Sequence, residues 1–208
     1  MTTPPAGPTP GTDGPLLVLV GPPGSGKSSV ARSLARLLGV EARDTDADVE
    51  QTAGATVPEI FYDSGEPAFR ELERDAVAAA LQEHRGVLAL GGGAPMDPVT
   101  RERLRGHRVV FLDVGLAAAT RRIGMDAPRP LLLDAPRATW LRLMDERRPV
   151  YTEVAALVVM TTDLDPDGVA EQVLAAFPHL RAGAGPDRGP DHGPDHGPGQ
   201  VRDAGGDA

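Results

Sequence analysis

A glycine-rich segment, residues 21–28 with the sequence Gly-Pro-Pro-Gly-Ser-Gly-Lys-Ser, is the part of the chain best suited to chemistry. Its glycines permit a loop whose backbone N–H groups point inward at phosphate oxygens. Lys27 supplies a mobile charge for the β- and γ-phosphates of a nucleotide, and the Ser28 hydroxyl can ligate Mg²⁺. The segment lies between an apolar run and a helical pattern, the context that a phosphate-binding loop requires. It therefore predicts a nucleoside triphosphate site rather than an idle turn.

Two carboxylates follow the second expected strand, in the run Asp44-Thr45-Asp46. At the carboxyl edge of a parallel sheet they would lie beside the phosphate-binding loop. One carboxylate near Mg²⁺ and another near an acceptor hydroxyl suit phosphoryl transfer to an alcohol. The alternative is a turn, or an N-cap for a helix over Ala47–Ala53, and the run alone leaves both interpretations open.

Three glycines and two arginines are candidates for binding the acceptor. Gly91, Gly92 and Gly93 follow an apolar run and would let a ligand reach bare backbone N–H groups, although a flexible turn also fits. Arg70 has Glu66 and Glu73 at helical spacing and could belong to a solvated ion-pair face. Arg147 could be a cation at a helix C-terminus. If both arginines reached the pocket, they would clamp a carboxylate with a geometry that lysine cannot match.

A proline-rich segment, 124–136, contains Arg129 between Pro128 and Pro130. It is too short and too broken for a helix, so it predicts a mobile lid over the site. A lid would exclude water from ATP, and Arg129 on it would reach the transferring phosphoryl group.

The elements that must position these residues alternate between short apolar runs and longer helical patterns. This alternation predicts an α/β fold with a parallel five-stranded sheet and helices on both faces, in three layers. The expected strands are Leu16–Val20, Glu41–Thr45, Val87–Leu90, Val109–Asp113 and Leu157–Met160, the second weakened by its charged residues. The expected helices are Lys27–Leu38, Glu66–Arg85, Leu116–Ile123, Ala138–Arg147 and Gly168–Phe177.

Glycine and proline gather at the two ends of the 208-residue chain. Residues 1–15 and 181–208 contain nearly half of the 25 glycines and 21 prolines, which predicts two disordered tails. The domain over 16–180 is long enough to bury a core without disulfides or a structural metal. In the C-terminal tail, His192 and His196 with neighbouring aspartates could bind a transition metal, but a solvated tail is the better interpretation.

Composition excludes several classes of function. The chain has no cysteine, so disulfides, cysteine-ligated metals and thiol nucleophiles are excluded. A net charge of −9 and 3% aromatic residues disfavour nucleic acid as a partner. No apolar run approaches the ~20 residues of a membrane helix, and no secretory signal is present. We expect a cytoplasmic monomer with no membrane partner. Lys27 is the only lysine among 21 basic residues, so composition also marks the phosphate site.

In combination and in this order, the motifs resemble the shikimate kinase family, over about residues 16–177. The resemblance rests on the glycine-rich loop, Asp-Thr-Asp, the pattern Gly65-Glu66-x-x-Phe69-Arg70-x-x-Glu73, the triple glycine, Arg129-Pro130-Leu131-Leu132 and Arg147-x-Pro149-Val150-Tyr151. It implies a P-loop kinase fold similar to nucleoside monophosphate kinases. It also implies transfer of the γ-phosphoryl group of ATP, with Mg²⁺ as cofactor, to the 3-hydroxyl of shikimate. The products would be ADP and shikimate 3-phosphate, in chorismate and aromatic amino acid biosynthesis.

The resemblance further implies roles for individual residues. Catalysis would use Asp46, Lys27 and Arg129. ATP would be bound by Gly24, Ser25, Gly26, Lys27, Ser28, Ser29, Arg122, Arg129 and Pro166, with adenine between Arg122 and Pro166. Shikimate would be bound by Asp46, Phe61, Phe69, Arg70, Glu73, Gly91, Gly92, Gly93 and Arg147. Ser28 would hold Mg²⁺ directly and Asp44 through water.

Three residues depart from the family pattern, namely Arg43, Ser29 and Val150, and Arg43 makes the second strand the least secure element. Two alternatives remain: another P-loop small-molecule kinase, similar to gluconate kinase, and a non-catalytic nucleotide-binding module. The first would not need two converging arginines with a triple glycine. The second has no use for the Asp46 carboxylate beside a γ-phosphate.

Overall fold

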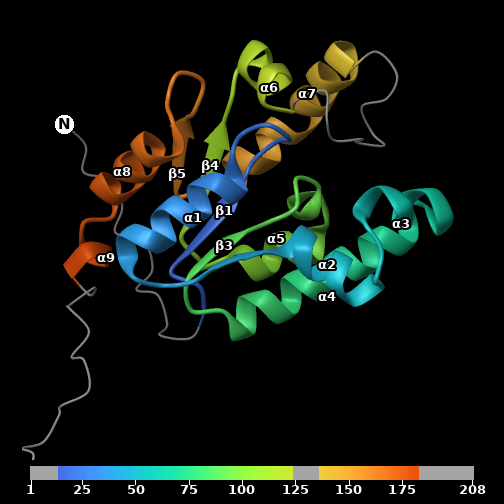
Figure 1. Ribbon diagram of the computed structural model, residues 1–208, viewed down its shortest axis with the longest axis horizontal. Coiled ribbons are helices and arrows are strands. Elements are labelled where there is room, and N and C mark those ends of the chain that lie inside the picture. Colours follow the sequence, from blue (N-terminus) through green and yellow to red (C-terminus); the bar gives the residue numbers. More distant parts are fainter. Residues whose placement is uncertain (1–13, 124–135, 183–208) are drawn as a thin grey trace, which may run out of the picture.

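A five-stranded parallel sheet forms the centre of the computed structural model, which describes residues 14–123 and 136–182 (Figure 1). The strand order is β2-β3-β1-β4-β5. The strands are β1 (Leu17–Val20), β2 (Ala42–Asp44), β3 (Val87–Ala89), β4 (Val109–Asp113) and β5 (Leu157–Met160). Because every neighbouring pair is parallel, the carboxyl ends of all five strands meet at one edge.

Helices cover both faces of this sheet and so make the predicted three layers. On one face lie α1 (Lys27–Leu38), α8 (Pro166–Ala176) and the short α9 (His179–Ala182). On the other lie α4 (Gly65–Glu83), α5 (Pro98–Leu104), α6 (Leu116–Ile123) and α7 (Pro136–Val154). Strand β1 is fully buried, with Leu17 and Leu19 facing the first layer and Val18 and Val20 facing the second. None of the helices over 14–123 and 136–182 has the length and apolar character needed to cross a membrane.

A smaller apolar cluster holds the region beside β2. Val49 on α2 (Thr45–Ala53), Ile60 on α3 (Val57–Asp63) and Phe69 on α4 are buried together. Helix α3 starts at a capping box. The Thr56 side chain accepts a hydrogen bond from the backbone N–H of Glu59, and the Glu59 carboxylate accepts one from the backbone N–H of Thr56. This cluster fixes α2 and α4 to each other, so residues at their ends keep a fixed spacing.

The largest departure from the sequence prediction is α7, which runs to Val154 and not to Arg147. Pro149 lies inside it, although proline removes one helical hydrogen bond. The helix continues because Trp140, Met144 and Tyr151 are buried against the sheet, and this burial outweighs the lost bond. Arg147 is therefore within a helix, and its interpretation as a C-terminal cation is wrong.

The remaining departures are short elements and charged strand residues. Helices α3, α5, α9 and a 3₁₀ turn at Ala94–Met96 escaped prediction because three to seven residues give little periodicity. Helix α9 extends to Ala182, two residues past the expected domain boundary. The insecure second strand does form, and Arg43 is accommodated by ion pairs with Asp48 at 2.8 Å and Glu83 at 3.1 Å.

Candidate active site

The loop between β1 and α1 has the backbone geometry of a phosphate cradle. Gly24 and Gly26 adopt φ angles of 81° and 90°, which disfavour any residue with a side chain. A Cβ atom at Gly24 would also lie 2.8 Å from the carbonyl oxygen of Ala119, so this position is sterically closed as well. The loop ends at the N-terminus of α1, where N–H groups and the helix dipole favour an anion.

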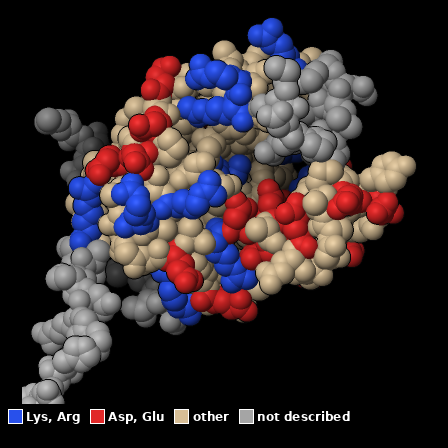
Figure 2. Space-filling view, in the orientation of Figure 1, with Lys and Arg blue, Asp and Glu red and all other residues tan. Residues whose placement is uncertain are grey.

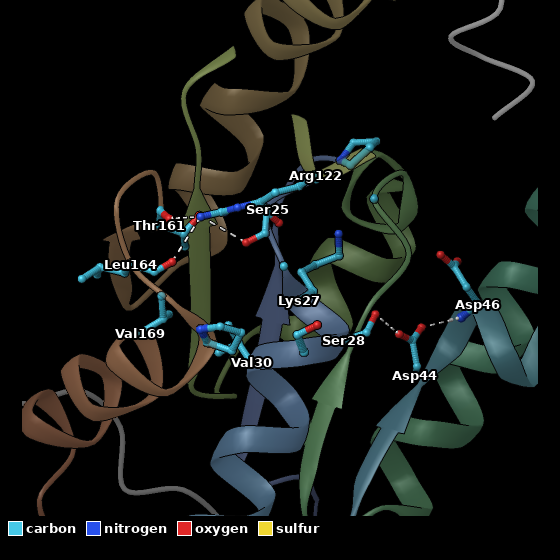
Figure 3. A pocket seen from close by; sticks show the side chains of 16 residues that line it. Ser25, Lys27, Ser28, Val30, Asp44, Asp46, Arg122, Thr161, Leu164 and Val169 are labelled. Carbon is cyan, nitrogen blue, oxygen red and sulfur yellow. Dashed lines mark hydrogen bonds between the residues drawn. The ribbon is translucent and has the colours of Figure 1, made fainter. Parts of the chain in front are cut away.

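A cleft of about 400 Å³ opens above this loop (Figure 3). Two groups of residues line it. One is the loop with the start of α1, and the other lies around the rim, at the ends of β2, α6 and β5. They include Pro23, Gly24, Ser25, Gly26, Lys27, Ser28, Ser29, Asp44, Asp46, Gly92, Arg122, Thr161, Leu164 and Pro166. Every described residue predicted to bind ATP is therefore in one cleft.

The Lys27 ammonium lies over the loop. Its Nζ donates hydrogen bonds to the carbonyl oxygens of Gly21 at 2.9 Å and Pro22 at 3.2 Å. Figure 3 shows the Lys27 ammonium and the Asp46 carboxylate pointing toward the same side of the cleft. A flexible four-carbon stem lets the ammonium exchange these carbonyl oxygens for phosphate oxygens.

Ser28, Asp44 and Asp46 form a chain of polar contacts at the end of β2. The Ser28 hydroxyl donates to Asp44 Oδ2 at 2.6 Å, and the backbone N–H of Asp46 donates to Asp44 Oδ1 at 3.1 Å. Asp44 is thus the N-cap of α2 and also faces the cleft, so both interpretations of the Asp-Thr-Asp run hold for it. A hydroxyl and a carboxylate in contact are hard oxygen donors of the kind that Mg²⁺ prefers.

Arg122, at the end of α6, is held at the opposite rim of the cleft. Its guanidinium donates to Thr161 Oγ1 at 3.0 Å and to the carbonyl oxygens of Thr161 and Leu164. These bonds fix a planar cation beside the loop that leads to Pro166, the first residue of α8. The sequence indicated Arg122 and Pro166 but missed Thr161 and Leu164, which lie in a loop without a motif.

The triple glycine brings charged side chains close to the backbone. A Cβ atom at Gly91 would lie 2.5 Å from both Asp46 Oδ1 and Glu73 Oε1, and one at Gly93 would lie 2.1 Å from an Arg70 nitrogen. The N–H of Gly91 donates to the buried Thr45 hydroxyl at 3.0 Å. Side chains therefore approach the backbone closely at Gly91 and Gly93, whereas Gly92 has ordinary contacts, and this segment is a packed part of the site and not a flexible turn.

Arg70 and Glu73 form a largely buried ion pair at 2.6 Å, while Glu66 pairs with Arg70 from the solvent side at 2.9 Å. Glu73 is 3% exposed. The interpretation of Arg70 and its acidic partners as a solvated ion-pair face is therefore wrong for the pair of Arg70 with Glu73. Burial raises the pKa of Glu73 above its ordinary value of 4.5, and the Arg70 guanidinium offsets only part of that effect. Asp46 and Arg147 also act on this pKa, so all four charged groups lie close together.

Arg147 and Tyr151 reach the same carbonyl group from α7. Arg147 is 8% exposed and donates to the Gly92 oxygen at 3.2 Å, and the Tyr151 hydroxyl donates to it at 2.6 Å. Burial raises the pKa of Tyr151 to about 12, so the phenol stays neutral and keeps its proton for this bond. The sequence motif contained Tyr151, but no spacing rule indicated that it would support the glycine segment.

The two predicted aromatic residues lie behind Arg70. Phe69 is buried in the cluster of α2, α3 and α4, and the half-buried Phe61 packs on it with ring centres 4.6 Å apart. The Arg70 guanidinium lies 5.3 Å from the centre of the Phe69 ring, which favours the cation. Arg129 and residues 124–135 of the expected lid lie outside the described residues.

Two sites thus meet at Asp46 and Gly92. Both residues line the nucleotide cleft. The Gly92 oxygen accepts a hydrogen bond from Arg147, and the Asp46 carboxylate lies close enough to Glu73 to raise the pKa of Glu73. A phosphate cradle beside a cationic cluster, with a carboxylate between them, can transfer a phosphoryl group to the hydroxyl of an anionic acceptor.

Known proteins are similar to this chain over most of its length. The family model for shikimate kinase matches residues 23–178. Shikimate kinase of Salinispora arenicola is 56% identical over 161 residues, which cover 77% of this chain and 96% of that protein. Shikimate kinase of Frankia casuarinae is 53% identical over 173 residues, covering 83% of this chain and 77% of that protein. The solved structure of Acinetobacter baumannii shikimate kinase in complex with shikimate is 35% identical, with a TM-score of 0.77, and covers 81% of this chain and 94% of its own.

Proposed function

The chain belongs to the shikimate kinase family, and from that premise we propose how its residues carry out the reaction. It is an ATP-dependent kinase that phosphorylates the 3-hydroxyl of shikimate, giving ADP and shikimate 3-phosphate in chorismate and aromatic amino acid biosynthesis. One observation carries the assignment of residues. Asp46 lines the nucleotide cleft, and its carboxylate also lies against Gly91 beside Glu73.

ATP binds along the cleft in this proposal. The N–H groups of Gly24, Ser25 and Gly26 hold the phosphates, and Lys27 donates to the β- and γ-oxygens. Ser29 follows on the first turn of α1. Arg122 and Pro166 hold the adenine, and the bonds of Arg122 to Thr161 and Leu164 keep its plane fixed.

Magnesium fits the oxygen donors at the mouth of the loop. The Ser28 hydroxyl would ligate the ion, and Asp44, in contact with that hydroxyl at 2.6 Å, would hold a water of its shell. When bound, Mg²⁺ supplies charge neutralisation at the β- and γ-phosphates. Asp44 itself is fixed by capping α2, so its carboxylate stays aimed at Ser28.

Shikimate binds on the acceptor side. Arg70 and Arg147 pair with its carboxylate, and the backbone of Gly91, Gly92 and Gly93 approaches the ring without obstruction. Glu73 holds Arg70 in place through the buried ion pair. Phe61 and Phe69 support the ring side of the pocket.

Phosphoryl transfer takes place between these groups. Asp46 accepts the hydrogen bond of the 3-hydroxyl and orients its oxygen toward the γ-phosphorus. The new bond joins that oxygen to phosphorus, and the bond from phosphorus to the β,γ-bridging oxygen breaks. The hydroxyl proton passes to the Asp46 carboxylate, and Lys27 stabilises the charge that develops on ADP.

A coupled ADP-release assay tests the function directly. We expect turnover that depends on shikimate and is absent with gluconate at the same concentration. Folded protein that releases ADP with gluconate but not with shikimate would contradict the assignment and favour the gluconate kinase-like alternative.

We also propose that residues 16–180 are the catalytic unit and that it acts as a monomer in the cytoplasm. Both halves of the site come from one chain, and the buried Leu180 ties the end of this unit to the core. A variant reduced to residues 14–182, which keeps α9 whole, should retain turnover within about twofold and sediment as a monomer. A large loss would show that a tail contributes to the site.

A further inference from the structure

One face of α7 contacts both substrate sites. Trp140, Met144, Arg147 and Tyr151 are spaced by four, three and four residues, so they lie on one side of the helix, and all four are buried. Arg147 and Tyr151 donate to the Gly92 oxygen on the acceptor side. Two turns away, the Trp140 Nε1 donates to the Pro23 oxygen of the phosphate-binding loop at 3.3 Å. The helix therefore bridges the two loops through hydrogen bonds.

The Trp140 bond has a specific task in the phosphate-binding loop. When the N–H groups of such a loop point inward at phosphate, its carbonyl oxygens point outward and need donors. Lys27 donates hydrogen bonds to the Gly21 and Pro22 oxygens, and Trp140 donates one to the next carbonyl oxygen, that of Pro23. Trp140 is 3% exposed, so its indole cannot exchange this partner for bulk water.

The two loops also lie close to each other. A Cβ atom placed on Gly92 would lie 3.5 Å from both the Gly21 oxygen and the Pro23 ring. A displacement of Pro23 can therefore reach Gly92 through α7, whose Trp140 bonds to Pro23 and whose Arg147 and Tyr151 bond to Gly92. Packed elements of this kind move together, because a close-packed interior transmits strain.

We propose that α7 couples nucleotide binding to acceptor binding, with Trp140 as the positioning residue. Its N–H fixes the Pro23 peptide relative to Gly92, so the loop that holds the phosphates and the segment that holds shikimate keep one spacing. Binding of either substrate then favours binding of the other. This inference rests on the proposed function and adds to it a residue that contacts neither substrate.

Two variants and one ligand pair test the coupling. W140F keeps a buried ring but loses the donor, and M144L is the matched control, a near-isosteric change between Trp140 and Arg147 on the same face. Calorimetry gives the shikimate Kd with and without ADP and Mg²⁺, and the ratio of the two values measures coupling. We expect the ratio to move toward one by about two- to tenfold in W140F, the factor for one hydrogen bond to a buried carbonyl. M144L should keep the ratio of the unaltered protein, and thermal unfolding shows whether both variants fold.

Each result decides the inference. An unchanged ratio in folded W140F, an equal change in M144L, or a ratio of one in the unaltered protein would overturn it. If W140F does not fold, the tryptophan fluorescence of the unaltered protein tests the inference, because Trp140 is the single tryptophan of the chain. Shikimate alone should then change that emission, and a constant emission would overturn the inference. The proposed function fails separately, through absent shikimate-dependent ADP release in the unaltered protein.

Discussion

The nucleotide side and the acceptor side of this site are built in different ways. One continuous stretch of the chain, residues 21–28, makes the loop proposed to hold the phosphates, and its residues 23–28 line the cleft. The acceptor side is assembled from side chains on α2, α4 and α7 around a glycine segment. Figure 2 shows acidic side chains gathered toward α2 and α3, whereas basic side chains lie over α1 and α6.

The difference teaches where each side is vulnerable. A backbone cradle depends on loop conformation and should tolerate changes of side chain outside its glycines, Lys27 and Ser28. An acceptor site made of buried charges depends on every partner, because removing one leaves another charge buried and unpaired. Substitutions that remove a single side chain should therefore act strongly on the acceptor side and weakly on much of the nucleotide side.

Asp46→Asn should have the largest effect, since Asp46 stands between the two sides. Loss of the carboxylate that orients the hydroxyl should lower kcat by about 10²- to 10⁴-fold. The Kd for ATP should stay within about twofold, because the cradle is untouched. Asp48→Asn is the matched control on the same helix, where the carboxylate pairs with Arg43 at 2.8 Å. If Asp46→Asn instead abolished ATP binding, Asp46 would be a structural part of the cradle.

Arg147→Ala should come next and should separate the two sides most clearly. Removing one partner of a desolvated charge pair costs about 2–5 kcal/mol, so the KM for shikimate should rise by roughly 30- to several thousandfold. The KM for ATP should change less than about threefold. Arg142→Ala removes the same charge from an exposed position on α7 and should leave both constants unchanged. A shikimate KM unaltered in Arg147→Ala would contradict the carboxylate clamp.

The same difference explains how much the sequence could predict. The cradle is local, so eight consecutive residues determine it. Apolar runs sufficed for four of the five strands, and the second was predicted mainly from its position in the alternation. The acceptor side depends on residues distant in the chain. The spacing of Glu73 in the sequence does not indicate that α2 and the glycine segment enclose it. Likewise, no residue near Pro149 indicates that the buried Tyr151 keeps α7 helical beyond the proline.

Motifs located the acceptor residues, but packing determines what they do. The glycine segment was expected to expose backbone to a ligand, and the structure shows that Gly91 and Gly93 also make room for Asp46, Glu73 and Arg70. Trp140 escaped notice because a buried aromatic residue on a helix is ordinarily core. Its hydrogen bond to Pro23 joins segments 117 residues apart, a distance over which no local pattern is informative.

Glu73→Gln should have an intermediate effect on binding and a distinctive effect on stability. Arg70 would keep Glu66 but lose its inner charged partner, so the shikimate KM should rise by about tenfold. The raised pKa of Glu73 means that the folded state holds this proton more tightly than the unfolded state. Its contribution to the free energy of unfolding is therefore greatest below pH 4.5 and declines as the pH rises through the raised value.

Urea titrations of both proteins between pH 4 and pH 7 measure this decline. The stability of the unaltered protein relative to Glu73→Gln should fall as the pH rises, because glutamine cannot ionise. Glu66→Gln is the control on the solvent side of the same arginine. A stability difference that is independent of pH would show that the pKa of Glu73 is the same in the folded and unfolded states.

Ser29→Ala should have the smallest effect, and it tests the tolerance of the backbone cradle. Ser29 lines the cleft beside Ser28, the proposed magnesium ligand, but its hydroxyl accepts a bond from the exposed Arg32 at 3.3 Å. Because the proposed phosphate contacts are backbone N–H groups, the KM for ATP should rise less than about threefold and the shikimate KM should not change. Ser28→Ala, one residue earlier, removes a proposed magnesium ligand and should cost far more at equal magnesium concentration. If the two serine variants lost activity equally, the nucleotide side would depend on its side chains as the acceptor side does, and the contrast between them would be wrong.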